Sequence, residues 1–282
     1  MAARTAIGLV LAFASTVLIS LSYLREHRAV TGLPPLALSR PLRSARLLLT
    51  NRDWLAGFAM ESAGFGLYVA ALGLAELALV QSVAAGGIGV LAVASARLAH
   101  RPLTARERGG AGIAALGLLL LAVSLGGGPE GDAQGSTAGI LVWLGATAGL
   151  AGVVVAAGRR IATGVANGIA GGLFFAAADL CTKLVTQGGT RLLFAVPMVA
   201  GYLLGTSLLQ IGYQNGAALT IAGIATLLTN ALPIAAGTVL LAEPVPAGAL
   251  GVLRVAAFFS VVVGAALLAR PEPRTAGMHG TD

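Results

Sequence analysis

One apolar stretch, Trp54 to Gln81, constrains the fold of this chain more than any other feature. A helix rises 1.5 Å per residue, so about 20 apolar residues cross the hydrocarbon core of a bilayer. This stretch is long enough, and it carries the carboxyl group of Glu61 within its first span, besides Glu76 at the turn that follows. A charge at that depth is costly and is rarely kept without a partner or a function. Glu61 is therefore expected either to be neutral or paired with a cation, or to bind a substrate or a coupling ion.

The composition extends this interpretation to the whole chain. Hydrophobic residues make up 57% of the 282 residues and charged residues only 10%, whereas soluble domains carry roughly 25% charged residues. Such a chain could not cover a water-exposed surface, so it is a multi-pass membrane protein. The net charge of +7 comes mainly from arginines between the apolar segments, which indicates membrane topology and not nucleic-acid binding. The single cysteine, Cys181, excludes an intrachain disulfide or a thiolate metal site.

The apolar pattern predicts an all-α, polytopic membrane bundle of about nine transmembrane helices. The expected spans are Thr5–Leu24, Trp54–Leu74, Leu77–Leu98, the segment ending at Leu125, Thr137–Ala157, Ile161–Lys183, Arg191–Tyr213, Ala217–Leu241 and Ala247–Ala269. Between the first two spans lies a basic linker, 25–53, whose segment Leu36 to Thr50 has too many arginines to span and is expected along the membrane surface.

The arginines also predict an orientation. Fourteen of the eighteen basic residues fall in the linker, in the loop around His100, at Arg159–Arg160 and in the tail. With nine helices these four regions share one face, which the positive-inside rule places in the cytoplasm. We therefore expect a plasma (inner) membrane protein with its N-terminus outside and its C-terminus inside.

A weak internal repeat divides the chain. Leu98-Ala99-His100-Arg101-Pro102 and Leu241-Ala242-Glu243-Pro244 each end a helix and lead into a Gly-rich one. The two halves are then four-helix repeats of inverted topology, joined by a connector helix, although chance similarity of two apolar segments is the alternative. The expected divisions are a first repeat at 1–126, a connector at 127–160, a second repeat at 161–270 and a disordered tail at 271–282.

Few ionisable residues lie at membrane depth besides Glu61. Asp179 and Lys183 are four residues apart on one helix and can pair along its face, and Asp179 can reach Arg254 if their helices adjoin. No cation and no second polar group is evident at the depth of Glu61, which disfavours an enzyme; no P-loop, zinc-binding helix or nucleophile elbow is present.

Polar and small residues add to this set. The membrane-depth amides and hydroxyls are expected mostly in interhelical hydrogen bonds, with Asn230, three residues before Pro233, as the leading cavity-lining residue. They are Gln81, Asn167, Gln210, Gln214, Asn215, Thr229 and Asn230. Three pairs of glycines spaced four apart predict close helix packing. They are Gly145 and Gly149, Gly168 and Gly172, and Gly201 and Gly205.

Three places resemble the drug/metabolite transporter superfamily, with EamA-like features, and within it the NIPA-like magnesium-transporter branch. They are Trp54-x-x-Gly57 followed by Glu61, Phe65, Tyr68 and Leu79-Val80-Gln81; Gly172-Leu173-Phe174 leading to Thr182-Lys183; and Leu241-x-Glu243-Pro244. Ser82 stands where that family would have proline. The resemblance implies that Glu61 is the main residue in transport and that Asp179 and Lys183 are of secondary importance.

The expected substrate-binding residues are Glu61, Tyr68, Gln81, Asp179, Lys183, Asn230 and Arg254, and Glu61 is the one expected metal ligand. The function expected first is a secondary transporter that moves a small metabolite or cation by alternating access. The alternatives are a Mg²⁺ or other divalent permease and a non-transporting membrane scaffold. No resident cofactor is expected, only Mg²⁺ or H⁺ as a transported or coupling ion. The expected partners are the bilayer and the substrate, with no nucleic acid, and the choice between monomer and homodimer stays open.

Overall fold

The computed structural model describes residues 2–72, 74, 83, 87–98, 100, 102–125, 136–185, 188–240 and 248–269. In these residues the regular structure is entirely helical, with ten α-helices and one 3₁₀-helix. They are α1 (Ala2–Thr31), α2 (Pro41–Thr50), α3 (Arg52–Leu72), α5 (Gly87–Leu98), α6 (Ala105–Leu125), α7 (Thr137–Ile161), α8 (Thr163–Val185), η1 (Gly189–Phe194), α9 (Ala195–Gln214), α10 (Ala218–Leu240) and α11 (Ala249–Ala269).

Four helical segments in the described residues are long and apolar enough to cross a membrane. They are Ala6–Thr31, Thr137–Gly158, Thr163–Thr182 and Gly189–Gln214. Large apolar side chains on the outer helices are exposed, including Val142 on α7, Leu203 on α9 and Val252 on α11. Faces like these suit lipid and not water, so the chain has the character of a helical membrane bundle, as the sequence predicts.

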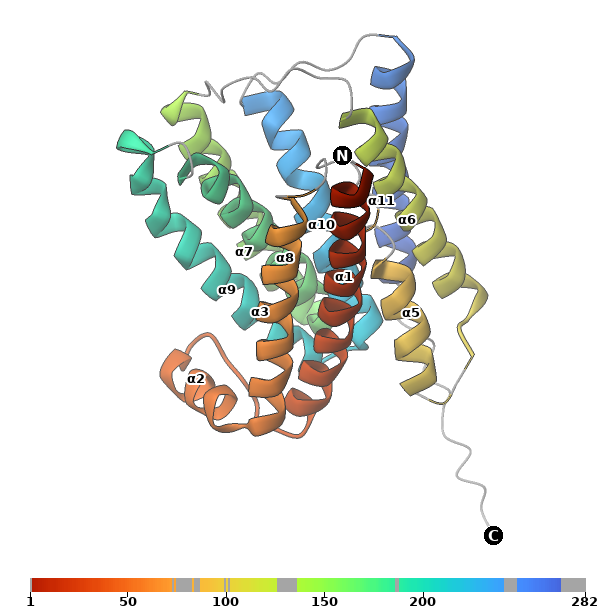
Figure 1. The fold of residues 1–282 in the computed structure, drawn as a ribbon. Helices are drawn as coiled ribbons and strands as arrows, with labels where there is room; N and C mark the ends of the chain where they lie inside the picture. The colour runs from red at the N-terminus through yellow and green to blue at the C-terminus, as the bar shows by residue number, and fades with distance from the viewer. Residues whose placement is uncertain are drawn as a thin grey trace.

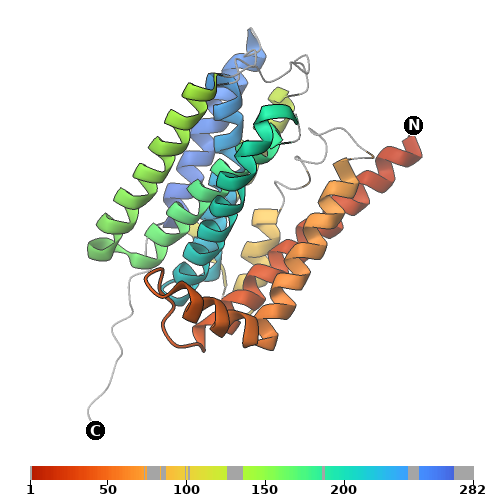
Figure 2. The ribbon, with the colours of Figure 1, turned by 90° about the vertical axis from the view of Figure 1, so that its left-hand side faces the viewer.

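The long helices run roughly side by side and alternate in direction (Figure 1). α1 starts at the end that holds the N-terminus, α3 returns to it, and the same alternation continues through α11. The short helix α2 lies at the opposite end, beside the start of α3 (Figure 2). Seen from that side, α1 and α3 lean away from α8 and α9 toward the N-terminal end and approach them at the end that holds α2.

Helix packing is closest where small residues face a neighbouring backbone. A Cβ on Gly172 would lie 2.9 Å from the Cα of Ala225, so α8 and α10 nearly touch there. A Cβ on Gly201 would lie 3.0 Å from the carbonyl oxygen of Phe174, which brings α9 equally close to α8. These glycine pairs pack as predicted. The described residues do not bear out the prediction for Gly145 and Gly149, because none of them lies within 4 Å of a Cβ placed on either glycine of α7.

The basic linker begins later than the sequence predicts. Residues 25–31 were expected in the linker 25–53, but α1 continues through them to Thr31 and ends just before Gly32. Exposed Arg25 and Arg28 alternate with buried Glu26 and Ala29, which is the pattern of one helix with a wet face and a packed face. The extra two turns carry Glu26 into the bundle.

Candidate functional site

The centre of the candidate site is Glu26, which lies in α1 and not in the basic linker that the sequence predicts from residue 25. Its side chain is 0% exposed, and its Oε2 accepts a 2.6 Å hydrogen bond from Nε2 of Gln210 in α9. Gln210 is itself 1% exposed. A carboxyl group away from water needs partners of this kind, because its desolvation is otherwise very costly. The 3.6-residue alternation with Arg25 and Arg28 was the one signal in the sequence that could have identified it.

Gly57 on α3 makes room for Glu26. A Cβ at this position would lie 2.7 Å from the Cγ of Glu26 and 3.3 Å from its backbone nitrogen. Further along the same pair of helices, Gly64 receives a 2.7 Å hydrogen bond on its carbonyl oxygen from the hydroxyl of Ser15. α1 and α3 therefore pack backbone to backbone along their length, with the stem of Glu26 held between them.

Glu61 lies one helical turn beyond Gly57 on the same helix, and its carboxyl group lies beside that of Glu26, where the two interact directly. Its side chain is half-buried. The expectation that no second polar group accompanies Glu61 is therefore wrong. It failed because the sequence interpretation ended the first helix before Glu26.

Aromatic and polar groups surround the two carboxyl groups. Tyr23, one turn before Glu26, makes a side-chain hydrogen bond to Thr226 of α10 and is close enough to both carboxyl groups to feel their charge. Tyr213, one turn after Gln210, is fully buried, and its ring contacts the ring of His27 edge-on at 5.7 Å. The site thus joins four helices, α1, α3, α9 and α10.

Several buried polar atoms at this site have no hydrogen-bond partner in the described part of the protein. They include Oε1 of Glu26, Oε1 of Gln210 and the hydroxyl of Tyr213. Two of these three atoms are pure acceptors and the third can accept. These oxygen atoms can therefore still accept a hydrogen bond from a donor or bind a cation.

A second polar cluster contains Asp179, one of the site residues predicted from the sequence. The hydroxyl of Tyr202 in α9 donates a 2.7 Å hydrogen bond to Oδ1 of Asp179 in α8 and lies 3.2 Å from Oγ1 of Thr182. The charge of Asp179 also acts on the hydroxyl groups of Tyr68 in α3 and Tyr23 in α1. Asp179 therefore faces the interior, toward the helices that hold Glu26 and Glu61.

The remaining predicted residues are distributed more widely. Asn230 in α10 is half-buried, and its side-chain amide donates a hydrogen bond to the carbonyl oxygen of Thr226, one turn earlier in the same helix. Thr226 is also the residue whose side chain bonds to Tyr23. Arg254 lies in α11, whose main neighbours are α6 and α10 and not α8. Gln81 and the side chain of Lys183 lie outside the described residues, so the proposed pairing of Lys183 with Asp179 stays a prediction.

Most of the membrane-depth amides and hydroxyls that the structure describes do not form the interhelical bonds that the sequence predicts. Asn167, Asn215, Thr229 and Asn230 bond to carbonyl oxygens four residues earlier in their own helices. Gln210 and Gln214 are the exceptions among the described residues. Gln214 donates to the carbonyl oxygen of Val30 at 2.9 Å and accepts from the backbone nitrogen of Leu36. It thereby ties the end of α9 to the end of α1.

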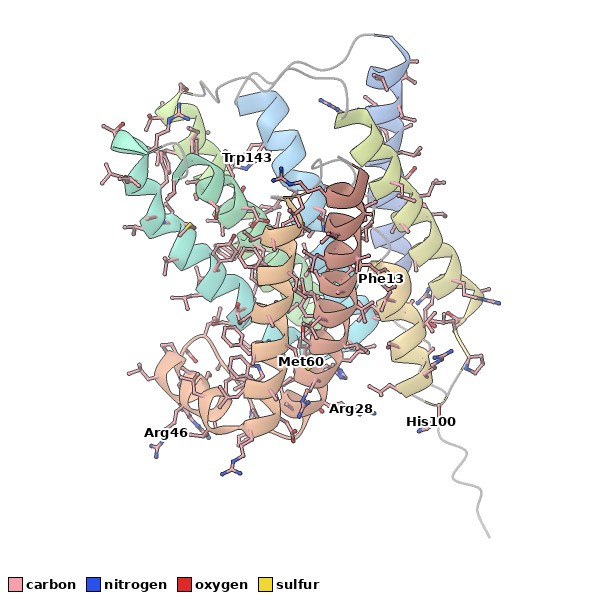
Figure 3. The ribbon with its side chains drawn as sticks, in the orientation of Figure 1. Phe13, Arg28, Arg46, Met60, His100 and Trp143 are labelled. Atoms are coloured by element: carbon pink, nitrogen blue, oxygen red, sulfur yellow. The ribbon has the colours of Figure 1, made fainter. Side chains whose placement is uncertain are left out.

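The contacts at this end of α1 close the bundle on one side of the carboxyl pair. Nε2 of His27 lies 3.0 Å from the carbonyl oxygen of Gly216, and Arg25 forms a 3.2 Å ion pair with exposed Asp53. Arg28, Arg46 and His100 lie at the same end, opposite the N-terminus (Figure 3). The carboxyl pair thus lies just inside the basic end of the bundle.

Comparisons with known proteins give no identification, since no family model, no curated protein and no solved structure matches the chain. The fold and composition define the class as a helical membrane protein.

Proposed function

We propose that this protein is a secondary transporter of the drug/metabolite type, which moves a small metabolite or cation by alternating access. The observation that carries the proposal is the pair of carboxyl groups, Glu26 and Glu61, held inside an apolar bundle where α1 packs against α3 and α9. Buried ionisable groups in membrane segments are expensive to keep and are typical of ion and substrate pathways. Glu61 is the substrate or coupling-ion site in this proposal.

The packing of the helices supports the inverted-repeat layout with nine spans. α1 packs against α3 and α5, as α8 packs against α9 and α10, and α6 meets α11 where the two halves join. α1 and α8 start at opposite ends of the bundle (Figure 1). In this layout α7 is the connector, and the Glu26–Gln210 contact joins the two repeats, which is where transporters of this construction bind their substrates.

The gathering of arginines at one end of the bundle supports the proposed orientation. The basic helix α2 and the loop at His100 lie at that end, and the N-terminus lies at the other (Figure 3). By the positive-inside rule the basic end faces the cytoplasm of a plasma-membrane protein.

Two alternatives fit the site less well. For a divalent cation permease, carboxylate oxygens are suitable ligands, but within the described residues no three His, Cys, Asp or Glu side chains gather. For a scaffold, Glu61 would pair with a helix of another protein, whereas here it lies against Glu26 of its own chain.

The test is flux through proteoliposomes that contain the wild type or Glu61→Gln, driven first by Mg²⁺ and then by a pH gradient. Glutamine keeps the shape and removes the charge. Asp53→Asn is the matched control, because it removes a carboxylate from the same helix at an exposed position. Proton-linked flux that is lost in Glu61→Gln and kept in Asp53→Asn supports the proposal. Mg²⁺ flux lost in the same way would favour the permease, and folded protein that is inert with every ligand would favour the scaffold.

A further inference from the structure

We propose that Glu26 and Glu61 form a single proton site, in which the two carboxyl groups share one exchangeable proton where α1 packs against α3 and α9. The proposal rests on the proposed transport function and names its coupling ion as H⁺. It also assigns a coupling role to Glu26.

The first step is the charge balance of the pair. Two carboxylates in contact repel each other, and inside a protein such a pair keeps a proton between its members. The neighbouring basic residues do not relieve this repulsion, because Arg25 and Arg28 are exposed and Arg25 is paired with Asp53. One proton on the pair removes one of the two charges and supplies the donor that the carboxyl oxygens need.

The part of the protein that the structure describes places no closer positive charge beside the pair. Among the described residues, the elements around the pair carry a set of titratable and charged groups: Arg4, Tyr23, Arg25, His27 and Arg28 of α1, Arg52, Asp53 and Tyr68 of α3, Arg97 at the C-terminal end of α5, Asp179 of α8, and Tyr202 and Tyr213 of α9. Of these, Arg52 and Arg97 are exposed, and the imidazole of His27 is engaged with the carbonyl oxygen of Gly216.

The packing selects a proton over a hydrated metal ion. Mg²⁺ usually keeps several of its waters and demands an octahedral shell. Glu26 is fully buried, its stem fits against the backbone of Gly57, and one of its oxygens already accepts the 2.6 Å hydrogen bond from Gln210. A hydrated cation needs more room than this packing leaves beside Glu26, whereas a proton needs none.

The pair lies beside the contacts that join the two halves of the chain, so its protonation state can affect how those halves pack. Glu26 accepts a hydrogen bond from Gln210 of α9, and Gln214 of α9 donates one to the carbonyl oxygen of Val30 near the end of α1. Both bonds join the first half of the chain to the second at the basic end. Loss of the proton leaves two like charges beside the Glu26–Gln210 contact. Proton occupancy can therefore bias the closure of this end, which is what coupling in alternating access requires.

The test is difference infrared spectroscopy of the full chain in lipid nanodiscs, which reads the C=O stretch of protonated carboxylic acids without any transport assay. We expect the wild type at neutral pH to show one more protonated acid per chain than the double variant Glu26→Gln, Glu61→Gln. Each single variant should lose the same band, because the remaining carboxyl group gains an amide donor and ionises. Asp53→Asn should keep it.

Three results would overturn the proposal. One is a wild type without any protonated carboxylic acid at neutral pH, which needs no variant to fold. Another is a band that survives in either single variant, because the proton then belongs to one carboxyl group alone. The third is loss of the wild-type band on addition of Mg²⁺, which would assign the pair to a divalent ion. A shared proton in a protein whose proteoliposomes are inert would instead keep the site and reject the transport function.

Discussion

Gln210 and Glu26 are 184 positions apart in the chain, and their side chains meet in a buried hydrogen bond of 2.6 Å between Nε2 and Oε2. Each residue is at most 1% exposed. The bond connects α1 to α9, and through Glu26 it reaches Glu61 on α3. This contact thus links helices from both halves of the bundle, as the bond from Gln214 to Val30 does nearby.

The first prediction concerns that contact. Gln210→Leu keeps the side-chain volume roughly similar but leaves Oε2 of Glu26 without its donor. A buried acceptor that loses its partner costs about 1–3 kcal/mol, so the thermal unfolding temperature in detergent should fall. Ser207→Ala, one turn earlier on α9, removes a half-buried hydroxyl that bonds only within its own helix and should change stability by less than about 0.5 kcal/mol. Equal stability of the two variants would contradict the assigned bond.

The second prediction compares two glycines of α3. Gly57→Ala would place a Cβ 2.7 Å from the Cγ of Glu26, so α1 and α3 must separate and stability should fall by about 1–3 kcal/mol. Gly66→Ala meets nothing within 4 Å and should be neutral or stabilise by up to about 1 kcal/mol, because alanine favours helix. Thermal unfolding of both variants measures the difference. The close packing at Glu26 is refuted if Gly57→Ala is as stable as Gly66→Ala.

The third prediction concerns the second polar cluster. Tyr202→Phe removes the hydroxyl that donates to Asp179 at 2.7 Å, and Asp179→Asn weakens the acceptor. Because the two side chains act on each other, their effects on the unfolding free energy should not add, and we expect a coupling energy of about 0.5–3 kcal/mol in a double-mutant cycle. Ser260→Ala on α11, whose hydroxyl bonds within its own helix, paired with Tyr202→Phe should be additive. Additivity in the first cycle would show that the hydrogen bond is absent in the membrane.

The fourth prediction concerns orientation. Cys181 is 0% exposed and can be removed as Cys181→Ala before single cysteines are introduced. Arg46→Cys lies at the basic end of the bundle, and Thr137→Cys lies at the start of α7, at the opposite end (Figures 1 and 3). In intact cells a membrane-impermeant maleimide should label Thr137→Cys only, and Arg46→Cys should react after the membrane is opened. The reverse pattern would invert the proposed topology.

The positions of the helices followed well from local sequence properties. The apolar stretches predicted α3, α7, α9 and α11 to within a few residues, and the segment ending at Thr50 forms the short helix α2. The main error was at the end of α1. Four charged or titratable residues in a row, Arg25 to Arg28, resemble a linker by composition, and only their spacing shows that Glu26 faces inward.

The site itself was only half visible in the sequence. Glu61 and Asp179 stood out because a carboxyl group in an apolar segment is rare. Glu26 and Tyr202 did not, since their roles depend on the helices that lie opposite them. The glycine pairs show the same limit, because Gly201 and Gly205 contact α8 while no described residue lies within 4 Å of a Cβ placed on Gly145 or Gly149, although the spacing is identical.

The sequence alone therefore determined that this protein is a bundle of apolar helices with few charges, because helix formation and membrane burial depend on residues close together in the chain. The tertiary structure decided which of those charges share a site. Glu26 meets Glu61 because Gly57 lets α1 and α3 touch, and Gln210 reaches Glu26 because α9 packs against α1. Contacts between residues 184 positions apart depend on how the helices pack together, which no local pattern of residues specifies.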